Sequence, residues 1–169
     1  LNESAYTIFN KDKIHRPRNP EIYKAPYVLF KKGLDCADYS IRAVYTESDF
    51  LYRETINCIK GSEKDKKTLL NLCGLLNSSL FSYFNLMLGS STGIEREQIF
   101  LEELGNYPYV YNDELVELVE KMQREEWGKN RNELQVALNQ CVMRMYGLQD
   151  NYFVDYALSI QIPMLCGTY

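Results

Sequence analysis

The fold of this chain is decided by one stretch, Asp65 to Gly93, which reads DKKTLLNLCGLLNSSLFSYFNLMLGSSTG. Between Leu69 and Leu88 apolar residues fall on nearly every side of a helix, which is typical of a helix buried in a core. At ~1.5 Å per residue, roughly 23 residues extend about 35 Å, enough to cross a small domain or a bilayer. Polar residues interrupt the run, and in hydrocarbon each would need a partner: Asn71, Asn77, Ser78, Ser79, Ser82 and Asn85. We therefore predict a buried core helix over Lys66–Leu88 and no membrane association.

Candidate caps flank this helix. Asp65 is a residue type favoured at the N-cap, and Gly89 suits the left-handed position that ends many helices. The loop that follows places Ser90, Ser91 and Thr92 between two glycines. Such a loop either makes a simple turn or lets a ligand approach the backbone closely, and the sequence leaves both interpretations open.

Composition is that of an ordinary globular domain. The 169 residues are 46% hydrophobic and 25% charged, which fits a single domain with a substantial core. The net charge is −4, but it is unevenly distributed: residues 1–67 hold 13 Lys and Arg against 10 Asp and Glu, whereas residues 68–169 hold 6 against 13. The N-terminal half is therefore the half expected to meet a polyanion.

The cysteines and the histidine indicate the cellular compartment and bear on whether a metal site is expected. Five cysteines cannot all pair and form no C-x-x-C, which is typical of a reducing compartment, so we expect a cytoplasmic protein. His15 is the single histidine, which disfavours a zinc site and a metal hydrolase. The first residue is not Met and no charged-then-apolar leader follows it, so we expect an excised piece of a longer protein.

The N-terminal half predicts a basic arm and two strands. Residues 1–20 are rich in cations and contain prolines that prevent a regular helix, so the arm is either a solvated connection or a phosphate-binding segment. Ala25–Phe30 and Tyr39–Tyr45 read as strands joined by the basic turn Lys31-Lys32-Gly33. Alternation places Ile41, Ala43 and Tyr45 on one face and Arg42 on the other. Ser48–Lys60 fits a strand or a short helix equally well.

The C-terminal half predicts more helix. Ile94–Leu101 reads as strand and turn, and Leu104–Val110 as an extended link. Apolar residues at helical spacing then predict a helix from Asp113 to Trp127 with an acidic outer face, another from Glu133 to Tyr146 that stops at Gly147, and a shorter one over Asp150–Ile160.

The common enzyme signatures are absent. The sequence holds no G-x-G-x-x-G after a strand, P-loop, G-x-S-x-G, H-E-x-x-H or EF-hand loop. Asn106-Tyr107-Pro108-Tyr109 is similar to the Asn-Pro-Pro-Tyr motif with which amino-methyltransferases hold a flipped adenine, but Tyr107 cannot supply the same rigid backbone. We interpret the tetrapeptide as a link anchored by Pro108, and keep a methyltransferase fragment as the less favoured alternative.

Several segments resemble one known family in order and spacing. The run Leu72–Ser91 resembles the "gLLNSklfsyyl" helix of the C-terminal target recognition domain of adenine-specific restriction–modification methyltransferases, the TaqI-like specificity domain. Tyr23–Phe30 (YKAPYVLF) is similar to the opening strand of that family, and Arg42–Tyr45 to its next strand. Leu104–Pro108 is similar to the link after the helix, and Tyr146–Leu148 to a late "lYGL" element.

The resemblance implies a function for the chain. It implies a bacterial, cytoplasmic module that binds double-stranded DNA and selects the site for adenine methylation by an upstream methyltransferase domain of the same chain. S-adenosylmethionine would bind in that catalytic domain, and no cofactor is expected here. The fragment would therefore not be an enzyme by itself. The alternative class is a protein-interaction or scaffold module, which the acidic helices favour.

These observations combine into one expectation. We predict an α+β fold in which a small, mostly antiparallel sheet, from the N-terminal half and the region after Gly93, packs on the long helix. Residues 1–110 would form the target recognition core around helix 66–88, and 111–169 a C-terminal helical segment of the same domain. Arginine grips guanine bidentately, which favours Arg42 and Arg96 for base contact. The full set of predicted DNA-contacting residues is Lys13, Arg16, Arg18, Lys31, Lys32, Arg42, Ser90, Ser91, Thr92 and Arg96.

Overall fold

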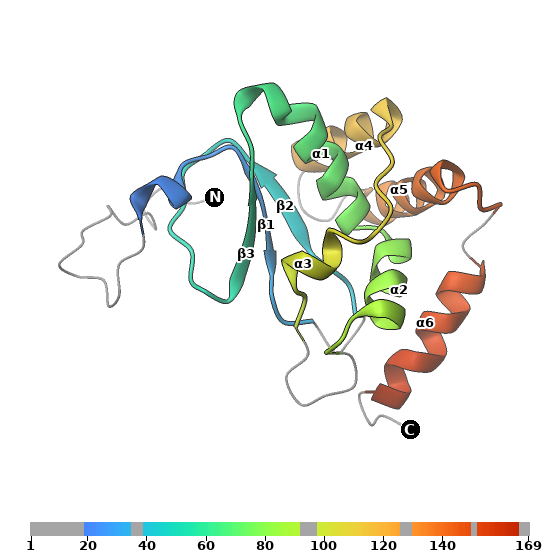
Figure 1. The fold of residues 1–169 in the computed structure, drawn as a ribbon. Helices are drawn as coiled ribbons and strands as arrows, with labels where there is room; N and C mark the ends of the chain where they lie inside the picture. Colours follow the sequence, from blue (N-terminus) through green and yellow to red (C-terminus); the bar gives the residue numbers. More distant parts are fainter. Residues whose placement is uncertain (1–18, 35–38, 92–97, 126–129, 150–151, 166–169) are drawn as a thin grey trace.

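The computed structural model describes residues 19–34, 39–91, 98–125, 130–149 and 152–165. Its fold is α+β, as predicted: a small antiparallel sheet is followed by helices (Figure 1). The elements, in chain order, are η3 Pro20–Tyr23, β1 Tyr27–Lys31, β2 Ala43–Thr46, β3 Ile56–Lys60, η4 Glu63–Asp65, α1 Lys66–Leu76, α2 Ser79–Leu88, α3 Leu101–Leu104, α4 Asp113–Arg124, α5 Arg131–Met145 and α6 Tyr152–Leu165.

The sheet has strand order β2-β1-β3, with both neighbours antiparallel to β1. Alternate residues of β1 point to opposite faces, and Val28 and Phe30 are buried on the side that α1 covers (Figure 1). Tyr45 of β2 joins them there. A fully buried apolar side chain contributes ~1.5–3 kcal/mol, so this face anchors the sheet to the helical core.

The prediction of one long helix over Lys66–Leu88 is wrong in one respect, because this stretch forms two helices, α1 and α2. The helix is interrupted at Asn77-Ser78, where Ser78 adopts an extended backbone (φ −84°, ψ 150°) between α1 and α2. The Ser78 hydroxyl accepts a hydrogen bond from the Phe81 N–H (3.3 Å) and donates one to the Leu75 carbonyl (2.6 Å). Asn and Ser compete with helical backbone bonds in this way, and the run Asn77-Ser78-Ser79 concentrates them at one point.

Asn77 also closes the free edge of β2. Its side-chain amide accepts from the Ala43 N–H (3.1 Å) and donates to the Ala43 carbonyl (2.9 Å), while Gln123 of α4 donates to the Tyr45 carbonyl (2.8 Å). The side-chain amides of Asn77 and Gln123 therefore bond the backbone groups of β2 with which another strand would otherwise pair. The polar residues that interrupt the apolar run therefore fasten the helices to the sheet.

The C-terminal helices pack on the α1–α2 pair. Gly74 of α1 lies against Leu115 and Val119 of α4, and Asn71 of α1 is completely buried. The Asn71 amide donates to the Val110 carbonyl (2.9 Å) and accepts from the Asn112 N–H (3.0 Å), which fixes the start of α4. α5 packs on α4 and α2, and α6 lies along α2 (Figure 1).

Several predicted boundaries are corrected. The second strand is shorter than predicted, because Tyr39 has a left-handed backbone (φ 54°) and pairing begins only at Ala43. Gly89 is extended (φ −68°, ψ 128°) and not left-handed, and Asp65 bonds Ser62 instead of a helical N–H.

After residue 93, the described residues contribute only an isolated bridge between Gln98 and Gly33, and no strand of the sheet. The three C-terminal helices lie close to the predicted ranges, and Gly147 (φ 72°) follows the end of α5 as expected. Trp127 and Gly128, where the first of them was predicted to end, lie outside the described residues; α4 ends at Arg124.

Candidate nucleic-acid interface

Among the described residues, the face of the sheet that points away from α1 is exposed in its middle and covered at one end. Its middle row is Leu29, Val44 and Cys58, and Val44 is 50% exposed. At the start of β1 this face is covered: the Tyr27 ring lies 6.0 Å from that of Tyr52, and Tyr27 is fully buried. Among the described residues, the exposed part of this face therefore extends from Val44 to the end where β1 finishes.

Two predicted contact residues lie together at this open end. The last pair of the β1–β2 register is Phe30 with Ala43. Lys31 is the last residue of β1 and Arg42 directly precedes β2, so both residues lie next to this pair. Both side chains belong to the outer face and both are exposed. The Arg42 Nε donates to the Ser40 hydroxyl (3.3 Å), which restrains the guanidinium near the start of β2. The prediction that Arg42 points away from the core is confirmed.

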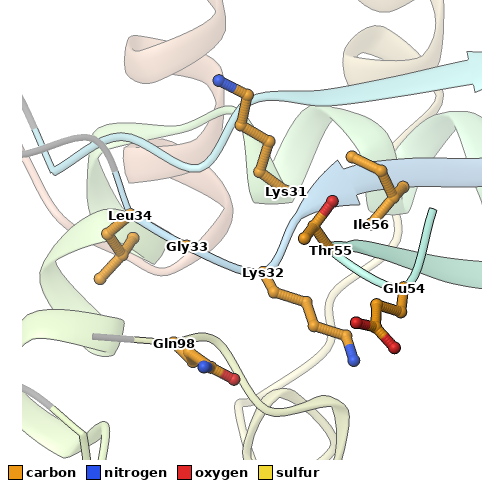
Figure 2. Close-up of a pocket in the computed structure, with 8 residues that line it drawn as sticks. All are labelled: Lys31, Lys32, Gly33, Leu34, Glu54, Thr55, Ile56 and Gln98. Atoms are coloured by element: carbon orange, nitrogen blue, oxygen red, sulfur yellow. The ribbon is translucent and has the colours of Figure 1, made fainter. Parts of the chain in front are cut away.

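Lys32 lines a hollow beside this pair. The hollow encloses about 650 Å³ and is lined by residues 31–34, 54–56 and Gln98. Figure 2 shows Lys31 and Lys32 leaving the chain in opposite directions, with Lys32 extending to the side on which Glu54 lies. The Lys32 N–H donates to the Thr55 carbonyl (2.9 Å) and the Lys32 carbonyl accepts from the Ile99 N–H (2.7 Å). Its backbone is thus fixed on both sides, and only its long side chain is free to adjust.

The two serines of the loop after α2 differ in environment. Ser90 is exposed, and its backbone N–H donates to the Glu103 carboxylate (3.2 Å). Ser91 is only 4% exposed, and its hydroxyl donates to the Gln98 carbonyl (2.5 Å) and accepts from the Gln98 N–H (2.8 Å). Ser91 therefore has a structural role at this position, and direct contact with DNA stays an untested prediction for both serines.

The remaining predicted contact residues lie outside the described parts of the chain: Lys13, Arg16, Arg18, Thr92 and Arg96. Sequence reasoning missed Gln98, Thr55 and Glu54, which join the basic turn in the hollow. No sequence pattern singles these three residues out, because they meet Lys32 only through the pairing of β1 with β3 and the bridge at Gly33.

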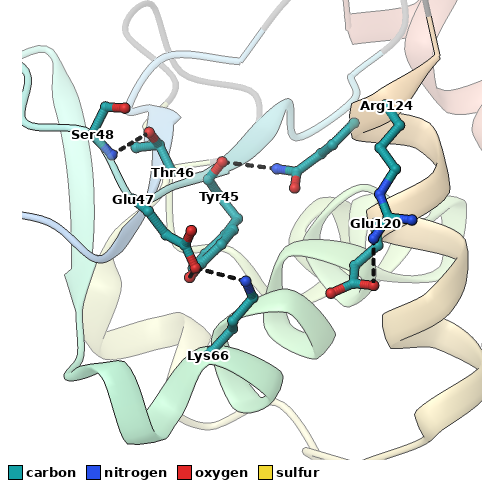
Figure 3. A network of polar contacts seen from close by, with 8 residues as sticks. Tyr45, Thr46, Glu47, Ser48, Lys66, Glu120 and Arg124 are labelled. Atoms are coloured by element: carbon teal, nitrogen blue, oxygen red, sulfur yellow. Dashed lines mark hydrogen bonds and ion pairs between the residues drawn. The ribbon is translucent and has the colours of Figure 1, made fainter.

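The other end of the sheet has a different charge. A second, smaller hollow of about 340 Å³ there is lined by Ala25, Pro26, Tyr45, Glu47 and Glu63. Figure 3 shows the Glu47 carboxylate between the Tyr45 hydroxyl and the Lys66 ammonium, each 2.8 Å away. Lys66 holds the pKa of Glu47 below its ordinary value, so this carboxylate stays charged.

The tetrapeptide Asn106–Tyr109 packs as a structural link. The Tyr107 ring is buried against Phe81 and Phe84 (centroid distances 6.0 and 5.9 Å), and the Tyr146 hydroxyl donates to the Pro108 carbonyl. This arrangement agrees with a link anchored by Pro108. Burial raises the pKa of Tyr107 to about 12, with the Glu103 charge adding to the shift.

Tyr107→Phe is expected to stabilise the protein. Among the described residues the buried Tyr107 hydroxyl has no hydrogen-bond partner, so its removal should raise the free energy of unfolding by ~1 kcal/mol at pH 7. A raised tyrosine pKa stabilises the fold below pH ~10, and this stability is lost as the pH rises from ~10 to ~12. Urea unfolding should show a shallower alkaline loss in the variant. Tyr146→Phe is the control at pH 7, because it removes a bonded hydroxyl and should lower the free energy of unfolding there; equal changes in the two variants at pH 7 would contradict the prediction.

The sequence matches one family of known proteins. A family model, the TaqI-like C-terminal specificity domain, matches residues 1–109, which is well over half of the chain. The chain belongs to this family. Membership of the TaqI-like specificity domains supports a target-recognition role in a restriction–modification system, and confirms the resemblance seen in the sequence. No curated protein matches the chain significantly.

Two further observations concern the described residues of this TaqI-like domain. None of its helices there is both long and apolar enough to cross a bilayer. Within the same ranges, His, Cys, Asp and Glu do not gather in groups of three that would hold a metal ion. Cys73 is almost completely buried, and burial raises its thiol pKa to about 12, so it remains protonated and unreactive at neutral pH.

Proposed function

We propose that this chain is the target recognition domain of an adenine-specific DNA methyltransferase. It binds double-stranded DNA through the open end of the sheet and positions the target site for a separate catalytic domain of the same chain. S-adenosylmethionine binds in that catalytic domain. The observation that supports the proposal is the sheet register, which puts the exposed Lys31 and Arg42 next to the last β1–β2 pair, beside the Lys32 hollow, in a chain of this family.

The proposed contacts divide into two kinds. Lys31 and Lys32 are compact cations on flexible stems, which suit phosphate oxygens and carry no sequence information. Arg42 presents a planar guanidinium that recognises guanine bidentately, and its bond to Ser40 limits its orientations before DNA arrives. Arg96 is proposed as a second base-reading arginine, and Lys13, Arg16, Arg18 and Thr92 as further contacts. The net charge of −4 is tolerated because phosphate binding is spread over the whole enzyme.

A salt series of gel shifts on the chain tests DNA binding. Pooled duplexes are titrated at about 20, 50, 100 and 200 mM salt, and the affinity is expected to fall steeply as salt releases the phosphate contacts. We expect weak binding, because this chain supplies only part of the DNA-binding surface. A folded chain that binds no duplex at about 20 mM salt would contradict the proposal and favour the interaction-module alternative.

A specific feature favours that alternative. Tyr152, Phe153 and Tyr156 on α6 are 74%, 66% and 54% exposed, and the rings of Tyr152 and Tyr156 stack 6.2 Å apart. Exposed aromatic clusters are characteristic of protein–protein contacts. Methyl transfer from S-adenosylmethionine to DNA by this chain alone would support the remaining alternative, a methyltransferase fragment, and would contradict the non-enzymatic role.

A further inference from the structure

A buried hydroxyl connects the loop after α2 to the basic turn after β1. Ser91 is only 4% exposed, and its hydroxyl satisfies both backbone groups of Gln98, donating to the carbonyl (2.5 Å) and accepting from the N–H (2.8 Å). Gln98 in turn forms the bridge with Gly33. One side chain far along the sequence thereby holds the segment that lies against the end of β1.

The next residue locks this segment onto the sheet. The Ile99 N–H donates to the Lys32 carbonyl (2.7 Å), and the Ile99 carbonyl accepts from the buried Asn57 amide of β3 (2.9 Å). The Ile99 side chain is 2% exposed and belongs to the hydrophobic core. The Lys32 backbone is therefore hydrogen-bonded to Thr55 on one side and to Ile99 on the other, while the Lys32 side chain lines the hollow.

We propose that Ser91 is a positioning residue for DNA binding: its hydroxyl holds Gln98 and Ile99 against the basic turn, and so fixes Lys32 where it meets a phosphate. Ser91 does not touch DNA in this role. The proposal rests on the proposed DNA-binding function, which it deepens by assigning Ser91 to the support of the contact surface. A fixed backbone lowers the entropy lost when the lysine binds, which is why a buried hydroxyl away from the DNA affects affinity.

The chain supplies a matched control in the preceding residue. Ser90 carries the same hydroxyl but is exposed, and its backbone N–H, which bonds Glu103, survives substitution. Ser91→Ala and Ser90→Ala therefore remove the same group from a buried and an exposed position one residue apart. Direct contact with DNA would make Ser90→Ala the more damaging change, whereas a positioning role makes Ser91→Ala the more damaging one.

The experiment measures hydrogen exchange and DNA binding for the full chain and both variants. Loss of one hydrogen bond should speed amide exchange at Gln98 and Ile99 about fivefold in Ser91→Ala. The same variant should bind duplex about fivefold more weakly, with the slope of log K against log salt reduced by about one, because one phosphate contact is no longer held. In Ser90→Ala, the amide exchange rates and the duplex affinity should stay within about twofold of those of the unmodified chain. Circular dichroism checks that both variants remain folded.

Three results would overturn the inference. The first is unchanged exchange at Gln98 and Ile99 in Ser91→Ala. The second is an affinity loss in Ser91→Ala with an unchanged salt slope, which would indicate general destabilisation without loss of a phosphate contact. The third is an equal or larger affinity loss in Ser90→Ala. Absence of DNA binding by the parent chain would instead contradict the proposed function itself, so the two failures are distinguishable.

Discussion

Replacing Lys31 and Arg42 together by glutamine is expected to weaken duplex binding by about 10- to 100-fold near 0.1 M salt. The two residues occupy neighbouring positions on the open face of the sheet, at the end of β1 and the start of β2. The change removes two cations, one suited to phosphate and one to a guanine edge, and a bidentate arginine contact alone contributes ~1–3 kcal/mol. Gel shifts or fluorescence anisotropy at several salt concentrations measure the loss.

Lys64→Gln is the control for the position of the removed charge. Lys64 is exposed in η4, which follows the end of β3 that pairs with the start of β1, so it lies at the opposite end of the sheet. It removes one positive charge, as each single variant does, far from the proposed interface and should leave the affinity within about twofold. A similar loss in the control would indicate a diffuse charge effect. That result would contradict the placement of the interface.

The single variants separate the two roles. Arg42→Gln should lower the preference for the cognate sequence over pooled duplexes, whereas Lys31→Gln should weaken both by the same factor and lower the salt slope by about one. Site mapping of DNA methylated by the full-length enzyme gives the same distinction in the native context. Unchanged specificity in Arg42→Gln would remove this arginine from the proposed base-reading residues.

Gly74→Ala is expected to lower the free energy of unfolding by ~1 kcal/mol. A Cβ at this position would lie 2.7 Å from Leu115 Cγ and 2.9 Å from Val119 Cγ2, and both of these α4 side chains are buried. Alanine is favoured over glycine inside a helix by ~1 kcal/mol, but overpacking a tight interface costs ~1–3 kcal/mol and displaces α4. Urea unfolding or a thermal scan measures the change; ~1 kcal/mol corresponds to roughly 2–4 °C in a domain of this size.

Gly105→Ala is the control for this prediction. Gly105 is exposed, its φ of −64° suits any residue, and a Cβ there would come no closer than 3.4 Å to the Glu102 carbonyl oxygen. Its stability should therefore change by less than ~0.5 kcal/mol. Equal destabilisation of both variants would show that the loss comes from the backbone and not from the α1–α4 contact.

Much of the fold was predictable from local pattern. The apolar run of residues 69–88 correctly indicated a buried core element, because hydrophobic residues in such density have to be removed from water. Alternation around Arg42 correctly assigned it to the solvent side. The interruption of the helix at Asn77 was not predicted, although the run Asn-Ser-Ser contains the polar side chains that cause it. An amide or a hydroxyl within a helix interrupts the helix only where it bonds other parts of the fold, as the Asn77 amide does with Ala43.

The candidate site was predictable only in part. The sequence by itself determined that the cations gather in the first half, that the Lys31-Lys32 turn follows a strand, and that the chain resembles the specificity domains. Tertiary structure alone decided that the exposed Lys31 and Arg42 lie next to the last β1–β2 pair, that Gln98 meets Gly33, and that Ser91 is buried while Ser90 is not. The physical reason is that composition and periodicity act over a few residues, whereas strand register and hydrogen bonds between distant segments depend on how the whole core packs.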